Sequence, residues 1–415
     1  MSNPTSPTST TERSDILDVL RGFAIFGIFL ANTSGFSGYG FLNDEDREKL
    51  FTYQSDEWLG YLGRALVEGK FYSLFSLLFG IGFSIILTRN KQKGINPLGI
   101  FYRRLAILML FGAAHSFLLW DGDILLLYAL IGLLLPLFQK CTDKALLIWA
   151  AALILSPILI DVIKHLAHWD PSAGLKSMAI KTDVKHGITE QNFMYYLYKP
   201  GSGYDEVLKW CEGGFFWRYQ FIISSNRIPK VLGMFLIGFY VGRKMIYTRL
   251  EDYKPLLKKI QRWGYITGIP TSLLFAYFEG DGKSVPGSAL GLLDTFFYAV
   301  SVVPLSLAYT SSVCLLWLKA KQRGWLQKLA PVGRMALTNY ILQSIFGILI
   351  YYNLGLGLGI RFGPTIYFPI VIAVYLLQII YSNFWFRYFQ YGPLEWIWRQ
   401  FTYGKRLPLL KRTNG

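Results

Sequence analysis

Hydrophobic residues along the chain fall into runs that are long enough to cross a lipid bilayer, and short polar segments separate them. A transmembrane helix needs roughly 17–25 mainly apolar residues to span about 30 Å of hydrocarbon. Ten such runs can be placed, at residues 16–34, 70–88, 104–120, 123–139, 144–162, 229–243, 262–279, 287–318, 335–353 and 365–386. The pattern predicts an all-α fold, a polytopic membrane helical bundle with about ten transmembrane helices.

One long polar segment, residues 163–228, divides these runs into two groups of five. It is too polar to span a bilayer and predicts an extracytoplasmic loop between an N-terminal half, 16–162, and a C-terminal half, 229–386. Residues 1–15 are rich in Ser, Thr and Pro and predict a disordered cytoplasmic tail. Residues 387–415 combine tryptophans with basic residues and predict a cytoplasmic amphipathic tail on anionic lipid.

The charges of the connecting loops orient the predicted bundle. With the amino terminus placed inside, 26 Lys and Arg fall in the inner segments, against 6 in the outer segments once the long loop 163–228 is excluded. That loop is left out because long loops translocate largely regardless of charge. The segment 89–104 alone carries five basic residues and no acid. The positive-inside rule therefore predicts that both termini are cytoplasmic.

The composition supports a membrane protein and excludes several other classes. Hydrophobic residues make up 53% of the chain and charged residues only 16%, whereas soluble domains carry about a quarter charged residues. The net charge of +16 sorts by membrane side rather than into one patch, so we expect membrane lipids and no nucleic acid as partners. Cys141, Cys211 and Cys314 have neither disulfide nor metal-ligand spacing, and no metal is expected.

The first apolar run begins with an acid–base pair, Asp18 and Arg21, and ends near Asn32. Residues three apart on a helix share a face, so Asp18 and Arg21 can pair. A charge at mid-bilayer costs roughly 2.5–3.5 kcal/mol on insertion scales, and two interpretations of the pair follow. It anchors the helix end at the cytoplasmic interface, or Arg21 points into the bundle and meets an anionic ligand that arrives from the cytoplasm.

His115 lies within the third predicted span, eleven residues or about 16 Å beyond Arg104. Asp121 and Asp123 follow in the hairpin to the next span, and Asp294 lies at a comparable depth in the eighth. A neutral imidazole needs hydrogen-bond partners in a dry environment. His115 is therefore either a structural hydrogen bond between helices or a general base that a carboxylate orients. In the second interpretation the catalytic candidates are His115, Asp121, Asp123 and Asp294.

Arginines begin two of the predicted spans on the cytoplasmic side. Arg103 and Arg104 begin the third span, and Arg334 begins the ninth. Guanidinium groups recognise phosphate through paired hydrogen bonds, so these three residues and Arg21 are the candidates for binding the phosphates of a donor substrate. Glu395 in the C-terminal tail is a candidate partner for Arg334.

Six segments, in order along nearly the whole chain, resemble the YeiB-like bacterial membrane family. They are RSDILDVLRGFAIFGIFLAN near the start, GKFYSLFSLLFGIGF (69–83), the Arg-Arg to Gly-Asp-Ile-Leu segment (103–125), RIPKVLGMFLIGFYVGR (227–243), PVGRMALTNYILQS (331–344) and GPLEWIWRQFTYGKRLPL (392–409). The C-terminal half resembles that family's domain of unknown function, number 418. The resemblance implies a multi-pass protein of the bacterial inner membrane, in a family loosely described as involved in transport.

A more distant resemblance carries chemistry. The first run, with Leu-Arg-Gly at residues 20–22, is similar to that of the membrane acyltransferase superfamily. This similarity implies a bundle of about ten helices that takes an acyl group from coenzyme A inside and delivers it to a sugar outside. A histidine commonly ends the first helix in acyltransferase-3 enzymes, whereas this chain has Asn32 there. We therefore expect His115 to substitute from the third span.

The expected function is a transmembrane acyltransferase-like enzyme without a bound cofactor. Acyl-CoA is the expected donor, and an unidentified small molecule or glycan is the acceptor. A small-molecule transporter or exporter that uses Asp18, Arg21, His115 and Asp294 as a relay is the alternative, and a non-catalytic scaffold is a third. A cavity that ends at His115 favours acyl transfer, whereas one that continues through both faces favours transport.

Overall fold

The computed structural model describes residues 14–94, 96–280 and 289–411. Within these ranges the chain is helical and contains no strand, only one isolated bridge between Phe389 and Leu410. The predicted all-α fold class is therefore confirmed. The predicted tail 1–15 lies almost entirely outside the described residues.

Each of the ten predicted spans contains an α-helix. In chain order these are α1 (Asp15–Phe36), α4 (Lys70–Gln92), α5 (Pro97–Leu118), α6 (Leu125–Gly132), α7 (Asp143–Ala167), α10 (Arg227–Arg243), α11 (Lys254–Gly280), α12 (Ala289–Trp317), α15 (Ala336–Tyr351) and α16 (Pro364–Tyr388). Among the described residues, six segments are long and apolar enough to cross a membrane. A multi-pass membrane protein is thus supported, while the count of ten stays a prediction.

The fourth predicted span, 123–139, is not one crossing helix. Its α-helix, α6, has eight residues, which is about 12 Å at 1.5 Å per residue. A short 3₁₀ segment, Leu135–Phe138, follows and contains Pro136. The apolar residues of α6 are mostly buried, but Pro136 removes a backbone donor and favours a break in the helix.

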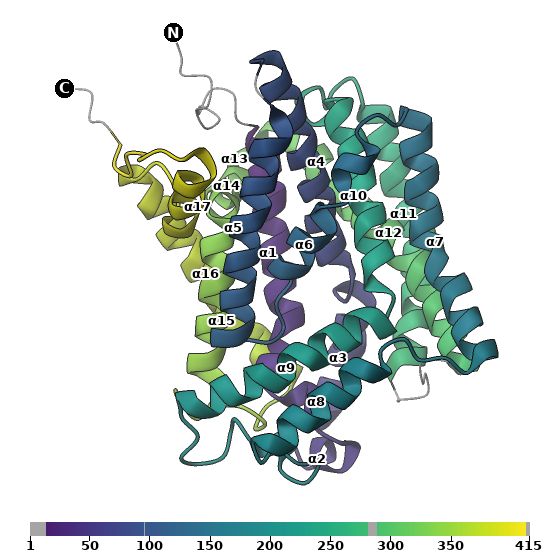
Figure 1. Cartoon of the computed structure of the whole chain (residues 1–415), viewed down its shortest axis with the longest axis vertical. Helices are drawn as coiled ribbons and strands as arrows, with labels where there is room; N and C mark the ends of the chain where they lie inside the picture. The colour runs from purple at the N-terminus through teal and green to yellow at the C-terminus, as the bar shows by residue number, and fades with distance from the viewer. Residues whose placement is uncertain (1–13, 95, 281–288, 412–415) are drawn as a thin grey trace.

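Further helices cover the two ends of the bundle (Figure 1). At one end lie α2 (Asp44–Glu48), α3 (Tyr53–Leu66), α8 (Ala173–Lys185) and α9 (Tyr204–Ser224). At the other lie α13 (Ala320–Leu326), α14 (Ala330–Arg334) and α17 (Pro393–Tyr403), together with both termini of the described chain. An even number of crossings requires both termini on one side. Their cytoplasmic assignment rests on the loop charges.

Glycines allow the central helices to approach closely. A Cβ at Gly80 of α4 would lie 2.8 Å from the carbonyl carbon of Phe235 on α10, and one at Gly22 of α1 would lie 2.5 Å from the Leu329 carbonyl oxygen. Small residues at helix crossings are typical of membrane bundles, because association there depends on tight van der Waals packing. This packing brings α4 against α10 and α1 against the segment that contains Leu329.

Candidate active site

His115 is buried in the bundle with both ring nitrogens hydrogen-bonded. Its Nδ1 lies 2.9 Å from Oδ1 of Asp123, and its Nε2 lies 2.8 Å from Oγ of Ser344. The three residues are 1%, 3% and 1% exposed, so the contacts are sheltered from solvent. A carboxylate, an imidazole and a hydroxyl in this order form the arrangement that activates a hydroxyl for nucleophilic attack.

The hairpin between α5 and α6 positions Asp123. Its Oδ2 accepts a hydrogen bond of 2.7 Å from the backbone N–H of Leu126, in the first turn of α6, which leaves Oδ1 for His115. Arg218 of α9 donates from Nε to the backbone oxygen of Asp123 at 3.1 Å. The carboxylate therefore both caps a helix and orients the imidazole.

Asp121, the other hairpin acid, has a different partner. Its Oδ1 accepts a hydrogen bond of 3.3 Å from Nε1 of Trp210 on α9. Burial raises the pKa of the Asp121 carboxyl above its ordinary value. The structure therefore brings Asp123 to His115, and it joins Asp121 to the helix that covers the hairpin.

Ser344 and Tyr340, both on α15, complete the surroundings of His115 and were missed at the sequence level. The ring centroids of Tyr340 and His115 are 5.0 Å apart. The Tyr340 hydroxyl is buried beside the Ile124 backbone and has no side-chain hydrogen-bond partner among the described residues. A spacing of four residues places both side chains on one helix face. In the segment 331–344, this spacing was the sequence feature that could have identified the pair.

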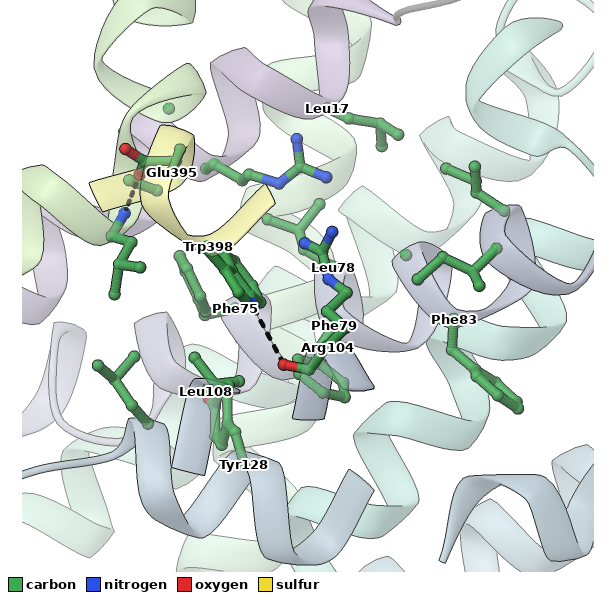
Figure 2. Close-up of a pocket in the computed structure, with 18 of the residues that line it drawn as sticks. Leu17, Phe75, Leu78, Phe79, Phe83, Arg104, Leu108, Tyr128, Glu395 and Trp398 are labelled. Carbon is green, nitrogen blue, oxygen red and sulfur yellow. Dashed lines mark hydrogen bonds between the residues drawn. The ribbon is translucent and has the colours of Figure 1, made fainter. Parts of the chain in front are cut away.

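A cavity of about 280 Å³ extends from the end of the bundle that carries α17 to the side chains beside His115. Its mouth is lined by Arg21, Arg89, Arg104, Arg334 and Arg399, with Glu395 and Trp398 of α17. Its middle is apolar, and Figure 2 shows Phe75, Leu78, Phe79 and Leu108 around it. Its inner end is lined by Ile124, Leu125, Tyr128 and Tyr340.

The inner end of the cavity therefore lies one layer of side chains from the imidazole. Ile124 directly follows Asp123 in the chain, and Tyr340 packs against the His115 ring. The lining contains no residue of α8 or α9 from the described parts of these helices. The lining thus runs from residues of α17 to residues beside the His115–Asp123 pair.

Two arginines at the mouth lie against aromatic rings. The Arg104 guanidinium lies 4.0 Å from the centroid of the Trp398 ring, and Trp398 Nε1 donates to the Arg104 carbonyl oxygen at 3.0 Å (Figure 2). Arg334 lies 4.0 Å from the Phe386 ring centroid. Stacking orients a guanidinium while its edge stays able to donate hydrogen bonds. With five arginines and one glutamate in the lining, the mouth is strongly positive.

Glu395 caps α15. Its carboxylate accepts hydrogen bonds from the backbone N–H groups of Leu337 (2.7 Å) and Thr338 (3.1 Å), and from the Thr338 hydroxyl (2.7 Å). Burial raises the pKa of Glu395 above its ordinary value, although the Thr338 hydrogen bonds oppose the rise. Glu395 thereby fastens α17 to the amino end of the helix that carries Ser344.

Arg103 lies outside this site. It is exposed and absent from the cavity lining, unlike its neighbour Arg104. Sequence placed both at one depth, but adjacent residues on a helix point about 100° apart, so only one can face the cavity.

Asp294 belongs to a different cluster, and its predicted partnership with His115 is wrong. It lies within electrostatic reach of Lys230 and Asp161, and Asp161 pairs with Lys164 at 2.9 Å. Equal depth along two helices does not specify which neighbour a side chain faces. Across the described parts of the chain, no group of His, Cys, Asp and Glu side chains could hold a metal ion.

Comparisons with known proteins give a consistent family. The sequence model of a family described as a protein of unknown function (DUF418) matches residues 241–405. The uncharacterized protein YxaH of Bacillus subtilis is 34% identical over 406 residues, covering 94% of each chain. The uncharacterized protein YeiB of Escherichia coli is 26% identical over 393 residues, covering 86% of this chain and 88% of that protein. No solved structure matches the chain.

Proposed function

Because the chain belongs to the YeiB-like DUF418 family of membrane proteins, we propose that it is a transmembrane acyltransferase of the bacterial inner membrane. In this proposal it takes an acyl group from cytoplasmic acyl-CoA and passes it to a hydroxyl of an extracytoplasmic small molecule or glycan. Both termini lie in the cytoplasm, and the cavity mouth is the donor entrance.

The observation that carries the proposal is one cavity with an arginine-lined mouth and an inner end beside a hydrogen-bonded His–Asp pair. Arg104 and His115 are eleven residues apart on α5, about 16 Å along the axis. Acyl-CoA carries its phosphates at one end of a long thiol arm and its thioester at the other. Arg21, Arg104 and Arg334 bind the phosphates, and the arm follows the cavity inward.

His115 is the general base of the transfer. With Asp123 accepting from Nδ1–H, the imidazole presents Nε2 as a proton acceptor. A hydroxyl at Nε2 loses its proton as it attacks the thioester carbonyl, and the imidazolium returns that proton to the leaving sulfur. Asp123 stabilises the imidazolium, because a carboxylate held near a developing positive charge costs no reorganisation when that charge forms.

A small-molecule transporter is the second candidate, and one observation favours it. Buried charged residues within a membrane bundle are costly and commonly mark ion or substrate pathways. Lys164, Asp161 and Asn226 form such a cluster, with Lys164 Nζ 2.9 Å from the Asp161 carboxylate and 2.7 Å from the Asn226 amide oxygen. This cluster lies apart from the cavity lining, and transport gives it a use that acyl transfer does not.

Radiolabelled acetyl-CoA supplied to the cytoplasmic face of membrane vesicles tests the proposal. We expect labelled product from vesicles that contain the wild-type protein. The His115→Ala variant should lose at least about a hundredfold of that labelling, since general base catalysis contributes roughly 10²–10⁴ in rate. His186→Ala is the matched control, because its imidazole bonds Glu212 on the covering helices. Equal labelling by both variants would remove His115 as the base.

A further inference from the structure

We propose that Ser344 is a covalent nucleophile, so that the acyl group rests on its Oγ between leaving the donor and reaching the acceptor. The inference rests on the proposed acyl transfer, which by itself requires only that His115 act as a base. Direct transfer from donor to acceptor and transfer through Ser344 both use the His115–Asp123 pair. They differ in whether the protein is ever acylated.

The hydrogen bonds fix which ring nitrogen faces the serine. Asp123 accepts at Nδ1, so Nδ1 carries the proton and Nε2 accepts from the Ser344 hydroxyl at 2.8 Å. The serine proton therefore already points at the base that would remove it. A nucleophile within hydrogen-bond reach of a base, with the base oriented by a third group, is the signature of covalent catalysis by an activated hydroxyl.

Other buried serines of the bundle make a different contact. Ser73 and Ser76 each donate to the backbone oxygen four residues earlier, at 2.7 and 2.8 Å, and Ser76 also contacts the Tyr128 hydroxyl at 2.8 Å. This bond within the helix is the ordinary way for a serine hydroxyl to be satisfied in an apolar environment. Ser344 is directed across to α5 instead, to a histidine that a carboxylate orients.

Tyr340 places a hydrogen-bond donor where the reaction would need one. Its side chain is one helical turn before Ser344, and its hydroxyl is buried beside the Ile124 backbone with no side-chain hydrogen-bond partner among the described residues. Tyr340 lines the inner end of the cavity, so this hydroxyl can donate to the carbonyl oxygen of a thioester bound there. Preorganised donors of this kind stabilise the oxyanion that forms when a nucleophile attacks.

The position of Ser344 suits two substrates that arrive from opposite sides. It lies eight residues from the start of α15 and seven from its end, so about 12 Å and 10 Å of helix separate it from the two ends. A covalent intermediate at mid-helix lets the donor carrier leave before the acceptor binds. The two substrates then need not occupy the bundle together.

The chemistry balances in two steps. First, the Ser344 Oγ attacks the thioester carbonyl carbon, the C–O bond forms, the C–S bond breaks, and the serine proton passes through His115 to the leaving thiolate. Second, an acceptor hydroxyl attacks the resulting ester, its proton passes through His115 to Oγ, and Ser344 is restored. The net reaction consumes one acyl thioester and one hydroxyl compound and releases one thiol and one ester.

The experiment incubates the purified full-length protein with isotopically labelled acetyl-CoA without acceptor, followed by peptide mass spectrometry. We expect the label on the peptide that contains Ser344, and none there in Ser344→Ala or His115→Ala. Ser344→Cys keeps a nucleophile and should carry the label as a thioester that neutral hydroxylamine removes. Ser301→Ala is the matched control, since Ser301 is an equally buried serine whose hydroxyl donates within α12, and it should be labelled like the wild type.

Each other outcome separates this inference from the proposed function. Ser344→Ala vesicles that still transfer acetyl groups within about threefold of the wild-type rate, while His115→Ala vesicles do not, would establish direct transfer and overturn only the covalent role. Label on a residue other than Ser344 would overturn it as well. A wild-type protein that neither becomes labelled nor transfers acetyl groups would overturn the acyltransferase proposal, and the role of Ser344 with it.

Discussion

The crossing of α4 and α10 offers a sharp test of the packing that surrounds the cavity. Gly80 lies on α4 where the backbone of α10 passes, so an alanine there would place its Cβ 2.8 Å from the Phe235 carbonyl carbon and 2.9 Å from the Phe239 nitrogen. The Phe235 carbonyl oxygen would be closer still. All of these atoms are backbone, which cannot rotate away as a side chain can.

The expected cost of Gly80→Ala follows from these distances. Non-bonded carbons are most favourable about 3.5–4.0 Å apart, so the two helices must separate by about 1 Å at the crossing. Overpacking of this kind typically costs roughly 1–3 kcal/mol, and replacing a helical glycine by alanine returns roughly 0.5–1 kcal/mol. Because rigid backbone receives the clash, we expect a net loss of about 1–2 kcal/mol in the free energy of unfolding.

Gly82→Ala is the matched control for this prediction. Gly82 is on the same helix two residues further along, and an added Cβ would meet nothing within 4 Å. This variant should gain stability by about 0.5–1 kcal/mol from helix propensity. The assay is the midpoint of thermal unfolding in one detergent at a fixed scan rate, because irreversible unfolding makes the midpoint depend on the rate. A Gly80→Ala midpoint at or above that of Gly82→Ala would refute the close crossing.

Three further predictions concern the mouth and the covered end of the bundle. Arg104→Ala should raise the KM for acetyl-CoA in vesicle assays with little change in kcat, because it removes binding present in ground and transition states alike; an unchanged KM would contradict phosphate binding there. Asp56→Ala should lower the free energy of unfolding by about 1–3 kcal/mol, measured by denaturant titration, since the buried carboxylate accepts the Thr365 N–H at 2.8 Å at the start of α16. Hydrogen bonding, foremost from Lys185, lowers the pKa of Glu212 in the folded protein. The ionised carboxylate therefore stabilises the folded state at pH values above its unfolded pKa, and this stabilisation is lost as the pH falls through the lower folded pKa. The difference in thermal midpoint between wild type and Glu212→Gln should therefore be present at pH 7, small because the carboxylate is 44% exposed, and should shrink toward pH 4.

The sequence predicted the contacts of the site that join residues close together in the chain, and it missed those between distant segments. His115 and Asp123 are eight residues apart across a hairpin, so depth along one helix and a turn at its end were enough to bring them together. Ser344 is 229 residues from His115 in sequence, and its contact depends on how α15 packs against α5. No local pattern specifies that packing, although the four-residue spacing with Tyr340 marked a face of α15 that carries two hydroxyls.

The corrections have the same physical origin. The apolar pattern predicted the ten runs that contain helices, but the length of α6 was set by the break at its end. Asp294 was expected at the depth of His115, but the charged groups near it are Lys230 and Asp161. Arg103 and Arg104 share a height and diverge in direction. Hydrophobic periodicity therefore gives the position of a residue along the membrane normal more reliably than its direction around the helix axis.

The Asp18–Arg21 pair shows how the direction of a side chain around the helix axis decides between a structural and a functional interpretation. Both interpretations of the pair placed it at the same depth, and they differ in what Arg21 faces. A pair that only anchors a helix end keeps its charged groups in water, yet Asp18 is 0% exposed and its carboxylate lies 2.5 Å from the Arg21 guanidinium. Arg21 lines the cavity, so the buried acid holds the guanidinium toward the interior of the bundle. Burial of the Asp18 carboxylate costs free energy. That cost has a functional explanation when Arg21, which Asp18 orients, binds the donor at the cavity mouth.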